Sequence, residues 1–484
     1  MNPIDPILYW NAVALEANRV SHTNGAGEQT GPTLSSRALA IVHLAMYDAL
    51  EGSVLAAGAS TPYLQIAVTA SDAGSSTDAA VAAAAHATLS ALFPSQKAFF
   101  DLQHGKAPLT GLRPQDGANL GARIGAAMLK DRKGDPDAKD NGYASQLHHG
   151  AHRPDPEDHG QGYHAPFYGE RSKCFAVTAR HGLSAPPDFS DPDYTRALKQ
   201  VRGKGIAPEL MGTLPSAYKK RTVDETLIGI YWGYDGPPDL GTPPRLYNQI
   251  VREVADKQGN TPRLNAKLFA MVNAAMGDAG ILAWEQKYNH NLWRPVVGIR
   301  EHDPSMGAIG AATSNIDEDC DTTWLPLGKP SSNADTVKQP AAKNGTPPFP
   351  AYPSGHATFG AAAFQIVRRF YGQGAGIGPD TLFSGQHFVS DECNGVTRDN
   401  KGNVRPRHRR SFDQGLWQMI VENGLSRVYL GVHWAFDAFL LNAQNQPDIG
   451  RSITENIGGV PLGLKIANDI FDSGLVKSTV PPSV

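Results

Sequence analysis

The chain has 484 residues, of which 40% are hydrophobic and 19% are charged, a composition typical of a soluble globular protein with a large buried core. The formal net charge is −3 at pH 7, which gives no support to nucleic-acid binding by electrostatics or to attraction by an anionic membrane surface. Gly (50 residues) and Pro (36 residues) are both abundant, so much of the chain is expected to be loop.

The sequence indicates neither a disulfide framework nor a secretory signal. Cys174, Cys320 and Cys393 are an odd number and lie far apart, so a reduced protein is the simpler interpretation, with a single bridge as the alternative. No Lys or Arg precedes Arg19, and no apolar run follows the first residues, which argues against a signal peptide. We expect a cytoplasmic protein, or one exported without a recognisable signal peptide.

The longest apolar stretches are residues 38–50 and 78–93. His43 and Asp48 interrupt the first stretch and His86 interrupts the second, so neither gives the ~20 apolar residues that a membrane span needs. We therefore expect no membrane partner and no nucleic-acid partner.

Apolar residues recur at three- and four-residue spacing along most of the chain, which predicts helices. In chain order the predicted helices cover residues 8–20, 34–50, 73–93, 116–131, 192–202, 222–233, 243–258, 264–293, 355–371, 411–443 and 463–474. Residues 132–170, 300–352 and 372–410 are rich in Gly, Pro, Asp and His and predict long loops. Few stretches alternate with a period of two, so the predicted fold class is all-α. Because aromatic residues are spread through these loops, we expect them to be ordered and to cover a site.

Three weaker patterns favour structural roles over functional ones. His148, His149 and His152 lie in a Pro- and Asp-rich loop, which is more typical of polar surface than of a zinc site. The glycines from Gly372 to Gly378 follow a helix and lack a Lys-Ser/Thr pair, so a flexible helix end is favoured over a phosphate loop. The basic run from Arg405 to Arg410 favours a solvated face or internal salt bridges over nucleic-acid binding.

Three other segments carry candidate chemistry, and the first contains Lys287 and Arg294. Seven residues are almost two helical turns, so the spacing predicts both side chains on one helical face, about 10 Å apart along the axis. Two cations on an otherwise apolar helix are costly unless an anion lies between them. A pair of surface salt bridges is the alternative, and this segment alone does not decide between the two.

The second segment is Pro353-Ser354-Gly355-His356, at the start of a predicted helix. Backbone N–H groups at a helix start are free to bind an oxyanion, with support from the helix dipole. Gly355 permits close approach of an anion, Ser354 adds a hydroxyl donor, and His356 is placed for proton transfer. A plain N-cap is the alternative.

The third segment contains Arg427, His433 and Asp437. The last two are four residues apart, which predicts that one helical face carries both. The carboxylate could then accept the Nδ1–H of the histidine and leave Nε2 free as a nucleophile or ligand. Arg427 offers a planar fork for an oxyanion. Together the three segments supply three cations, helix-terminal amides and two histidines, which points to binding of a highly charged tetrahedral or trigonal-bipyramidal oxyanion.

The order and spacing of these residues resemble the three-part signature of the vanadium-dependent haloperoxidases and the type-2 phosphatidic acid phosphatases. The signature covers residues 284–437, and the resemblance to the fungal vanadium chloroperoxidases is wider. It extends to Trp10–Thr23, Gly162–Gly169, Tyr231–Gly236 and Pro347–Gly360. The loop after Arg300 and residues 372–410 diverge from the family pattern.

The resemblance implies a vanadate site. Lys287, Arg294 and Arg427 match the cations that neutralise the equatorial oxygens of vanadate. Ser354 and Gly355 match the hydroxyl and amide donors to the same group.

Two histidines and two aromatic residues complete the implied site. His433 matches the histidine that binds vanadium through Nε2, with Asp437 behind it, and His356 matches the acid/base histidine that faces the apical oxygen. Trp284 and Phe349 match the apolar pair of the halide pocket.

The resemblance also implies a fold and a partner for one cation. Asp235 matches the acidic residue that pairs with the arginine equivalent to Arg427. The implied fold is two four-helix bundles with long covering loops. We expect an N-terminal bundle over residues 1–220 with the loop 132–170, and a C-terminal bundle over residues 221–484 that holds most of the active site.

The function implied is a vanadate-dependent haloperoxidase that oxidises chloride or bromide with hydrogen peroxide to hypohalous acid, which reacts with small organic acceptors. The expected catalytic set is His356, His433, Lys287 and Asp235: His356 would help to deprotonate peroxide and Lys287 would polarise it. Vanadium would act as a Lewis acid without redox cycling. The apolar pair favours a chloride-competent enzyme, and the oligomeric state is left open.

Two alternatives stay open. Phosphate and vanadate share charge and geometry, so the same residues would serve a soluble acid phosphatase in which His433 attacks phosphorus and His356 protonates the leaving alcohol. The lack of membrane spans counts against the lipid phosphatases. An oxyanion-storage protein would explain the cations, but it would not explain two well-placed histidines.

Overall fold

The computed structural model describes residues 4–107, 109–308, 310, 318–338, 343–374 and 376–484. It is predominantly helical, which confirms the predicted all-α class. The helices are α1 (Pro6–Ser21), α2 (Gly31–Val54), α3 (Thr77–Leu92), α4 (Lys97–Lys106), α5 (Pro114–Asp131), α6 (Tyr168–Arg171), α7 (Pro192–Lys204), α8 (Val223–Tyr231), α9 (Pro243–Lys257), α10 (Pro262–His290), α11 (Pro295–Arg300), α12 (Gly355–Phe370), α13 (Gly415–Tyr429), α14 (Ile449–Glu455) and α15 (Gly459–Ser473). Short 3₁₀ helices cover Pro94–Gln96, Pro208–Thr213, Pro304–Met306, Asp391–Cys393 and Ala435–Asp437, and β1 (His387–Phe388) pairs antiparallel with β2 (Arg410–Ser411).

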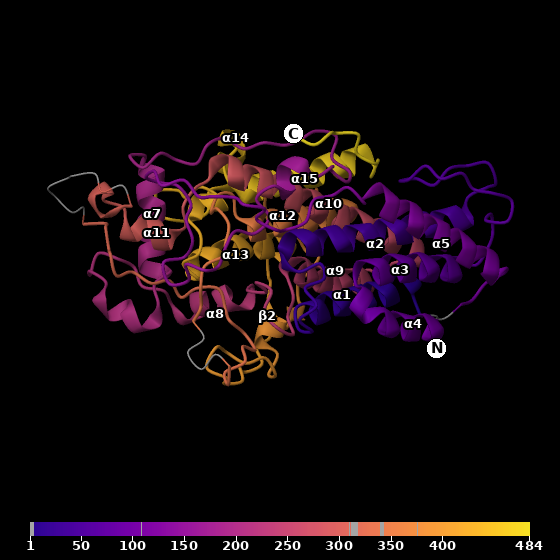
Figure 1. The fold of residues 1–484 in the computed structure, drawn as a ribbon, viewed down its shortest axis with the longest axis horizontal. Coiled ribbons are helices and arrows are strands. Elements are labelled where there is room, and N and C mark those ends of the chain that lie inside the picture. Colours follow the sequence, from indigo (N-terminus) through magenta and orange to yellow (C-terminus); the bar gives the residue numbers. More distant parts are fainter. Residues whose placement is uncertain (1–3, 108, 309, 311–317, 339–342, 375) are drawn as a thin grey trace.

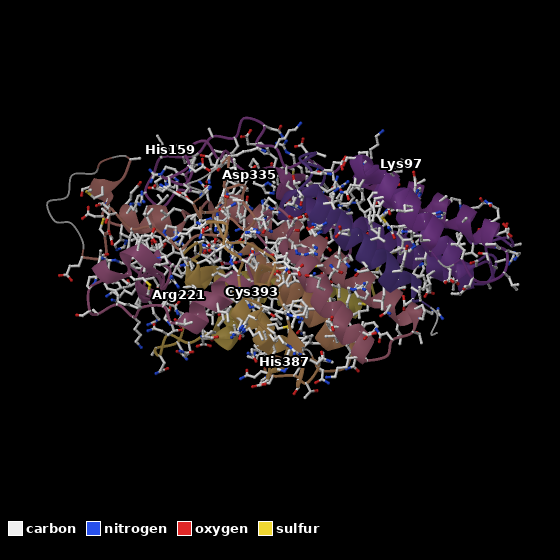
Figure 2. All side chains as sticks on the ribbon, turned by 90° about the horizontal axis from the view of Figure 1, so that it is seen from below. Lys97, His159, Arg221, Asp335, His387 and Cys393 are labelled. Atoms are coloured by element: carbon white, nitrogen blue, oxygen red, sulfur yellow. The ribbon has the colours of Figure 1, made fainter. Side chains whose placement is uncertain are left out.

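The helices form two groups that share α10. In the first group α2, α3 and α5 pack on one another, and in the second α12 packs on α13 and α15. The long helix α10 contacts both α2 and α12. Figure 1 shows α3, α4 and α5 at one end of an elongated molecule and α7, α8 and α11 at the other. Figure 2 marks the same two ends with Lys97 and with His159 and Arg221. Because α10 belongs to both groups, the division at residue 220 stays a prediction.

The central helix α10 is apolar because it forms the core. By length and composition it could cross a membrane, with a mean hydropathy of 1.2, but 94% of its apolar window is buried inside the protein. This burial is the behaviour of a core helix in a globular fold. The absence of a membrane partner stays a prediction.

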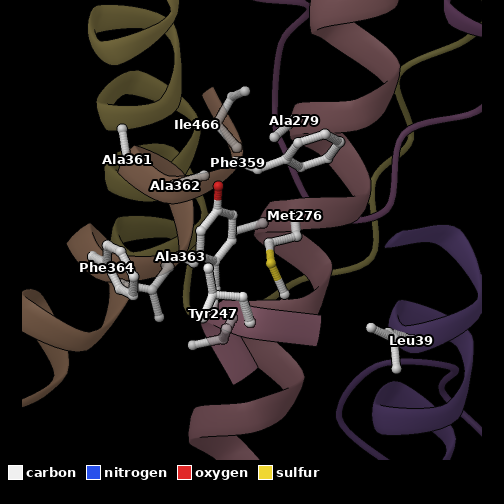
Figure 3. Close-up of a cluster of buried hydrophobic side chains, with 14 of the residues drawn as sticks. Leu39, Tyr247, Met276, Ala279, Phe359, Ala361, Ala362, Ala363, Phe364 and Ile466 are labelled. Carbon is white, nitrogen blue, oxygen red and sulfur yellow. The ribbon is translucent and has the colours of Figure 1, made fainter. Parts of the chain in front are cut away.

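Close packing fixes α12, the helix that begins at the candidate site. Figure 3 shows Ala362 and Ala363 of α12 near Tyr247 of α9, with Ala361 on the side of α15. On its other neighbour, α15, a Cβ on Gly463 would lie 2.4 Å from the carbonyl oxygen of Thr358. Only a glycine permits this approach of two backbones, so the α12–α15 contact holds α12 firmly along its length.

The predicted helix 264–293 is correct in its body and wrong at its end. The helix α10 ends at His290, and Asn291 adopts the left-handed conformation with φ of 47°. Arg294 then has extended backbone angles, as expected for a residue before proline. Lys287 and Arg294 therefore do not lie on one helical face.

The predicted helix 411–443 is also too long. The helix α13 covers Gly415–Tyr429, and Gly431 breaks it with φ of 74°. The remaining residues form a turn with the 3₁₀ helix Ala435–Asp437. A glycine in the left-handed region commonly ends a helix.

The other predicted helices are present, with ends shifted by a few residues. Periodicity missed α4, α6, α11 and α14, which have 10, 4, 6 and 7 residues and so carry little periodic signal. The described parts of the predicted loops 132–170, 300–352 and 372–410 are mostly irregular. Residues 309, 311–317, 339–342 and 375 of these loops lie outside the described residues.

Candidate active site

A cavity of about 180 Å³ lies where the three candidate segments meet. Its walls come from segments that are far apart in the sequence. The lining residues are Gly31, Pro32, His164, Asp235, Thr242, Pro243, Trp284, Lys329, Pro347, Pro348, Phe349, Gly355, His356, Phe359, Arg427 and His433. Seven of the eleven site residues predicted from the sequence line this cavity: Asp235, Trp284, Phe349, Gly355, His356, Arg427 and His433. The other four, Lys287, Arg294, Ser354 and Asp437, are not among the lining residues.

His433 presents Nε2 at the cavity in a neutral ring. Its Nδ1–H donates to Asp437 Oδ2 at 2.7 Å, and this carboxylate also accepts from the Trp434 amide at 3.0 Å. The predicted pair is confirmed, although a turn after Gly431 forms it and not a helical face. Burial and the nearby cations, Arg294 first among them, hold the pKa of His433 well below its usual value. The Nε2 atom is consequently a lone-pair donor, suited to be a ligand or a nucleophile.

Arg294 lies behind His433 and is almost wholly buried. Its Nε donates to the carbonyl oxygen of Phe349 at 2.8 Å, and its Nη1 donates to Val432 O at 2.7 Å and to His433 Nε2 at 2.9 Å. The Nη2 atom is buried and has no partner among the described residues. Burial lowers the pKa of this guanidinium to about 9. A buried cation with a free donor beside a histidine lone pair is a place where an anion would be stabilised.

Lys287 is fully buried but is not one of the lining residues. Its Nζ donates to the carbonyl oxygens of Pro350 at 2.9 Å, Ala351 at 3.0 Å and Pro353. It also lies 5.1 Å from the centroid of the Phe349 ring. Burial and the charge of Arg294 hold its pKa well below the usual value. The three carbonyl acceptors match the three N–H donors of the ammonium form, so Lys287 fixes the loop before α12 and contributes positive charge from behind the wall.

The N-terminus of α12 supplies backbone donors. Ser354 caps the helix: its Oγ accepts from the Ala357 amide at 3.4 Å, and its own amide donates to Asp437 O at 2.8 Å. The amides of Gly355 and His356 belong to the first turn and have no intrahelical acceptor. A Cβ on Gly355 would lie 3.2 Å from the Trp284 ring, so a larger residue would crowd this wall. The serine thus acts as the N-cap, and the glycine lines the cavity.

Arg427 reaches the cavity from α13 as half of a bidentate pair. Its Nη1 and Nη2 donate to Asp235 at 3.0 and 2.8 Å, while its buried Nε has no partner among the described residues. Burial alone would raise the pKa of Asp235, but the charge and the hydrogen bonds of Arg427 outweigh that effect and lower it. The predicted pairing of Asp235 with Arg427 is therefore present, and a second unpartnered guanidinium N–H lies beside the cavity.

His356 is held in one orientation by the backbone. Its Nε2 lies 2.7 Å from the carbonyl oxygen of Gly233, so in the neutral ring Nε2 carries the proton and Nδ1 is the acceptor. Burial, together with the charge of Arg427, lowers its pKa to about 3. The ring is therefore neutral and able to accept a proton at Nδ1.

The opposite side of the cavity is apolar and aromatic. The ring centroids of Trp284 and Phe349 are 4.8 Å apart, and each lies 6.0 Å from the ring of His164. Burial lowers the pKa of His164 to about 4, so this ring is also neutral. The cavity thus has one cationic, hydrogen-bonding side and one apolar side.

Sequence reasoning missed several lining residues. His164 lies within the matching segment Gly162–Gly169, and aromatic residues in a loop were the signal that could have found it. Lys329 lies in a loop, and Thr242 and Pro243 begin α9; none gave a comparable signal because single residues form no pattern. Gly233, which bonds His356 through its carbonyl group, falls in the matching segment Tyr231–Gly236.

The weaker patterns have structural roles. The part of the chain that the structure describes contains no group of three or more metal-ligating side chains. His148 is exposed, but His149 packs on Trp293 with ring centroids 4.6 Å apart and His152 is buried, so the prediction of polar surface is wrong for His152. Arg405 pairs with Glu392 at 2.7 Å and Arg410 pairs with Glu422 at 2.8 Å, which confirms internal salt bridges.

Comparisons with known proteins identify the family. The "Vanadium chloroperoxidase N-terminal domain" matches residues 4–103, and the "VCPO second helical-bundle domain" matches residues 267–456. Vanadium chloroperoxidase of Curvularia inaequalis is 33% identical over 598 aligned residues, covering 98% of this chain and 90% of that protein.

Solved structures share the fold at low sequence identity. A bacterial vanadium-dependent iodoperoxidase superposes with a TM-score of 0.64 at 18% identity, covering 98% of this chain and 97% of its own. A holo-type bacterial vanadium-dependent chloroperoxidase gives a TM-score of 0.57 at 18% identity, covering 92% and 93%. The sequence relationship over nearly the whole chain shows that the protein belongs to the vanadium-dependent haloperoxidases.

Proposed function

We propose that His433, Arg294, Arg427 and the first turn of α12 hold vanadate, the cofactor of this family. The observation that carries the proposal is the convergence of one neutral lone pair with unpartnered donors. His433 Nε2 is the lone pair, and Arg294 Nη2 and Arg427 Nε are buried N–H groups without partners among the described residues. Vanadate would satisfy both kinds of group at once, because its metal can accept the lone pair and its oxygens can accept the N–H donors. The residues present therefore fit vanadate.

Each residue has a separate task in this proposal. His433 Nε2 would hold the metal in place of its present contact with Arg294 Nη1. The guanidinium groups and the amides of Gly355 and His356 neutralise the oxygens, and Lys287 adds charge from behind the wall. Bound vanadate supplies a Lewis acid that activates hydrogen peroxide for attack by halide.

His356 moves the proton in this scheme. Its Nδ1 is the free acceptor because Nε2 donates to Gly233 O. An anion beside the ring offsets the field of Arg427 and raises the pKa of His356 from its low value toward the range useful for proton transfer. We propose that Nδ1 accepts a proton from peroxide.

Substitution His356→Ala tests this role. We expect turnover per bound vanadium to fall about 100-fold, a usual contribution of a general base. Vanadate affinity is expected to fall by only about tenfold, the lower end of the effects of residues that are not ligands. Steady-state halogenation and elemental analysis on the same samples give both quantities. Collapse of vanadate affinity with unchanged turnover per vanadium would show that His356 holds the cofactor and moves no proton.

The choice of halide is a finer assignment than membership of the family. We propose that the dry wall of Trp284 and Phe349 makes the enzyme competent for chloride as well as bromide, with hypohalous acid as the product and small organic molecules as acceptors. Chloride is the more strongly hydrated halide. Removal of its water shell therefore raises its nucleophilicity more than that of bromide. The cationic charges of Lys287 and Arg294 lie 5.1 and 4.9 Å from the Phe349 ring, which supports an anion against this wall.

Substitution Phe349→His is expected to reduce chloride oxidation more than bromide oxidation. The imidazole adds a polar, titratable neighbour that brings water to the wall, whereas the control Phe349→Leu keeps the wall dry. The measurement is kcat/KM for the two halides side by side. Equal losses for both halides in the histidine variant would remove Phe349 from the specificity argument.

A phosphatase is the second candidate, since the same unpartnered donors fit phosphate. His433 Nε2 would then attack phosphorus and His356 would protonate the leaving alcohol. The apolar wall and the family assignment favour the peroxidase. The cytoplasmic location and the absence of nucleic-acid and membrane partners stay predictions.

A further inference from the structure

The segment of residues 388–393 lies along the loop that carries Gly233 and Asp235. Ser390 Oγ donates to Tyr231 O at 2.6 Å, Tyr231 Oη donates to Phe388 O at 2.9 Å, and the Asp391 amide donates to Tyr234 Oη at 2.8 Å. Figure 2 marks this segment with the label of Cys393. Three long-range bonds in six residues hold the two stretches side by side.

A fully buried carboxylate, Glu392, lies at the centre of this contact. Its Oε1 accepts from the Tyr234 amide at 3.2 Å, and its Oε2 accepts from Ser332 Oγ at 2.6 Å and from Arg405 Nη1 at 2.7 Å. A Cβ on Gly233 would lie 2.7 Å from Glu392 Oε1. The carboxylate therefore abuts the Gly233–Tyr234 peptide directly, and only a glycine permits that approach.

The same short loop orients two groups of the candidate active site. The Gly233 carbonyl accepts from His356 Nε2 at 2.7 Å, and Asp235 holds Arg427 through two hydrogen bonds. The His356 bond sets the tautomer of the ring, and the Asp235 pair sets the direction of the guanidinium plane. Any shift of this loop acts on both groups at once.

From this arrangement we propose that Glu392, held by Arg405 and Ser332, is a positioning residue that fixes the loop 233–235 and thereby the tautomer of His356 and the orientation of Arg427. This role also accounts for Arg405, the first residue of the basic run from Arg405 to Arg410. Arg405 takes no part in the reaction itself. The inference rests on the proposed roles of His356 and Arg427 in the site. Outer partners of this kind change metal affinity or activity by about 10–100-fold in other metal sites.

The variant Glu392→Gln tests the proposal, because it keeps the shape of the side chain and removes the charge that pairs with Arg405. The first readout is the ¹⁵N spectrum of histidine-labelled, vanadate-free protein, with the His356 signals among the 16 histidines assigned from their loss in His356→Gln. We expect the wild type to show the Nε2–H tautomer of His356 and the variant to show a mixture of tautomers. The second readout is vanadate affinity by equilibrium dialysis, expected to fall about tenfold.

Asp380→Asn is the matched control. Asp380 is also a buried carboxylate with an arginine partner, Arg368, at 3.0 Å, and it accepts from the Leu416 and Trp417 amides. Arg368 lies twelve residues beyond His356 on α12, about 18 Å along the axis. We expect this variant to lose thermal stability without changing the His356 tautomer or the vanadate affinity.

Two results would overturn the proposal. One is a Glu392→Gln protein with the wild-type His356 tautomer and vanadate affinity, which would leave Glu392 a purely structural role. The other is equal change in Glu392→Gln and Asp380→Asn. If Glu392→Gln does not accumulate as folded protein, Arg405→Lys takes its place in the test. This variant keeps the positive charge but removes the planar guanidinium, and the proposal requires it to shift the His356 tautomer in the same direction. The His356 tautomer is measured without vanadate, so it tests the role of Glu392 independently of vanadate binding. A wild-type protein that binds no vanadate would contradict the proposed function but would leave this test intact.

Discussion

Replacement of His433 by alanine is expected to abolish halide oxidation and to lower vanadate affinity by more than about 100-fold, beyond the usual effect of losing an outer partner. The substitution removes the neutral Nε2 lone pair, which contacts Arg294 and belongs to the same cavity wall as Arg427. The remaining cations would still attract an oxyanion, but no protein atom would bond to the metal. Elemental analysis after dialysis, together with the rate of halogenation, measures both effects.

His43→Ala is the matched control for that variant. His43 is a buried histidine of α2 whose pKa burial lowers to about 4, and it bonds Asn11 of α1 and the Leu39 carbonyl. Its loss is expected to reduce thermal stability while vanadium content and specific activity per folded protein stay unchanged. Full halogenation activity in His433→Ala would contradict the assignment of the metal ligand.

The second large effect is expected for Arg294→Met, with vanadate affinity reduced about 100-fold, the upper end of effects seen for outer partners. The substitution removes the charge and the unpartnered Nη2 donor and leaves the Phe349 and Val432 carbonyls without their donor. Arg294→Lys keeps the charge but loses the fork, so we expect a smaller reduction of about tenfold. Calorimetric titration of vanadate-free protein at constant ionic strength gives both constants.

Arg368→Met separates site chemistry from general destabilisation. Arg368, on the far half of α12, is as deeply buried as Arg294, but its partner is Asp380. Its replacement is expected to leave vanadate affinity unchanged. Equal loss of affinity in the two methionine variants would mean that Arg294 acts through the fold alone.

The helices and the three candidate segments could be predicted from the sequence because both depend on local patterns. Helical periodicity is a local property, and it located the helix bodies. The pairing of His433 with Asp437 was also predicted correctly, although the turn after Gly431 and not a helix brings them together. The helical face proposed for Lys287 and Arg294 was wrong, because Asn291 ends α10 before the arginine.

Long-range contacts could not be predicted. Nothing local to Lys287 indicates that its three N–H groups point to carbonyl groups of the loop before α12, more than 60 residues away. Glu392 and Arg405 lie in the segment 372–410, which periodicity describes only as irregular, yet they support the loop beside His356. Such roles arise from packing and leave no spacing in the sequence.

The measurement that tests the central claim most directly compares two activities of one protein with and without vanadate. Halogenation of monochlorodimedone with hydrogen peroxide follows the peroxidase, and hydrolysis of p-nitrophenyl phosphate follows the phosphatase. We predict rapid halogenation by the vanadate-loaded protein, slow phosphate-ester hydrolysis by the vanadate-free protein, competitive inhibition of that hydrolysis by vanadate, and loss of both activities in His433→Ala. A vanadate-saturated protein that oxidises no halide, while the vanadate-free protein hydrolyses phosphate esters efficiently, would contradict the account.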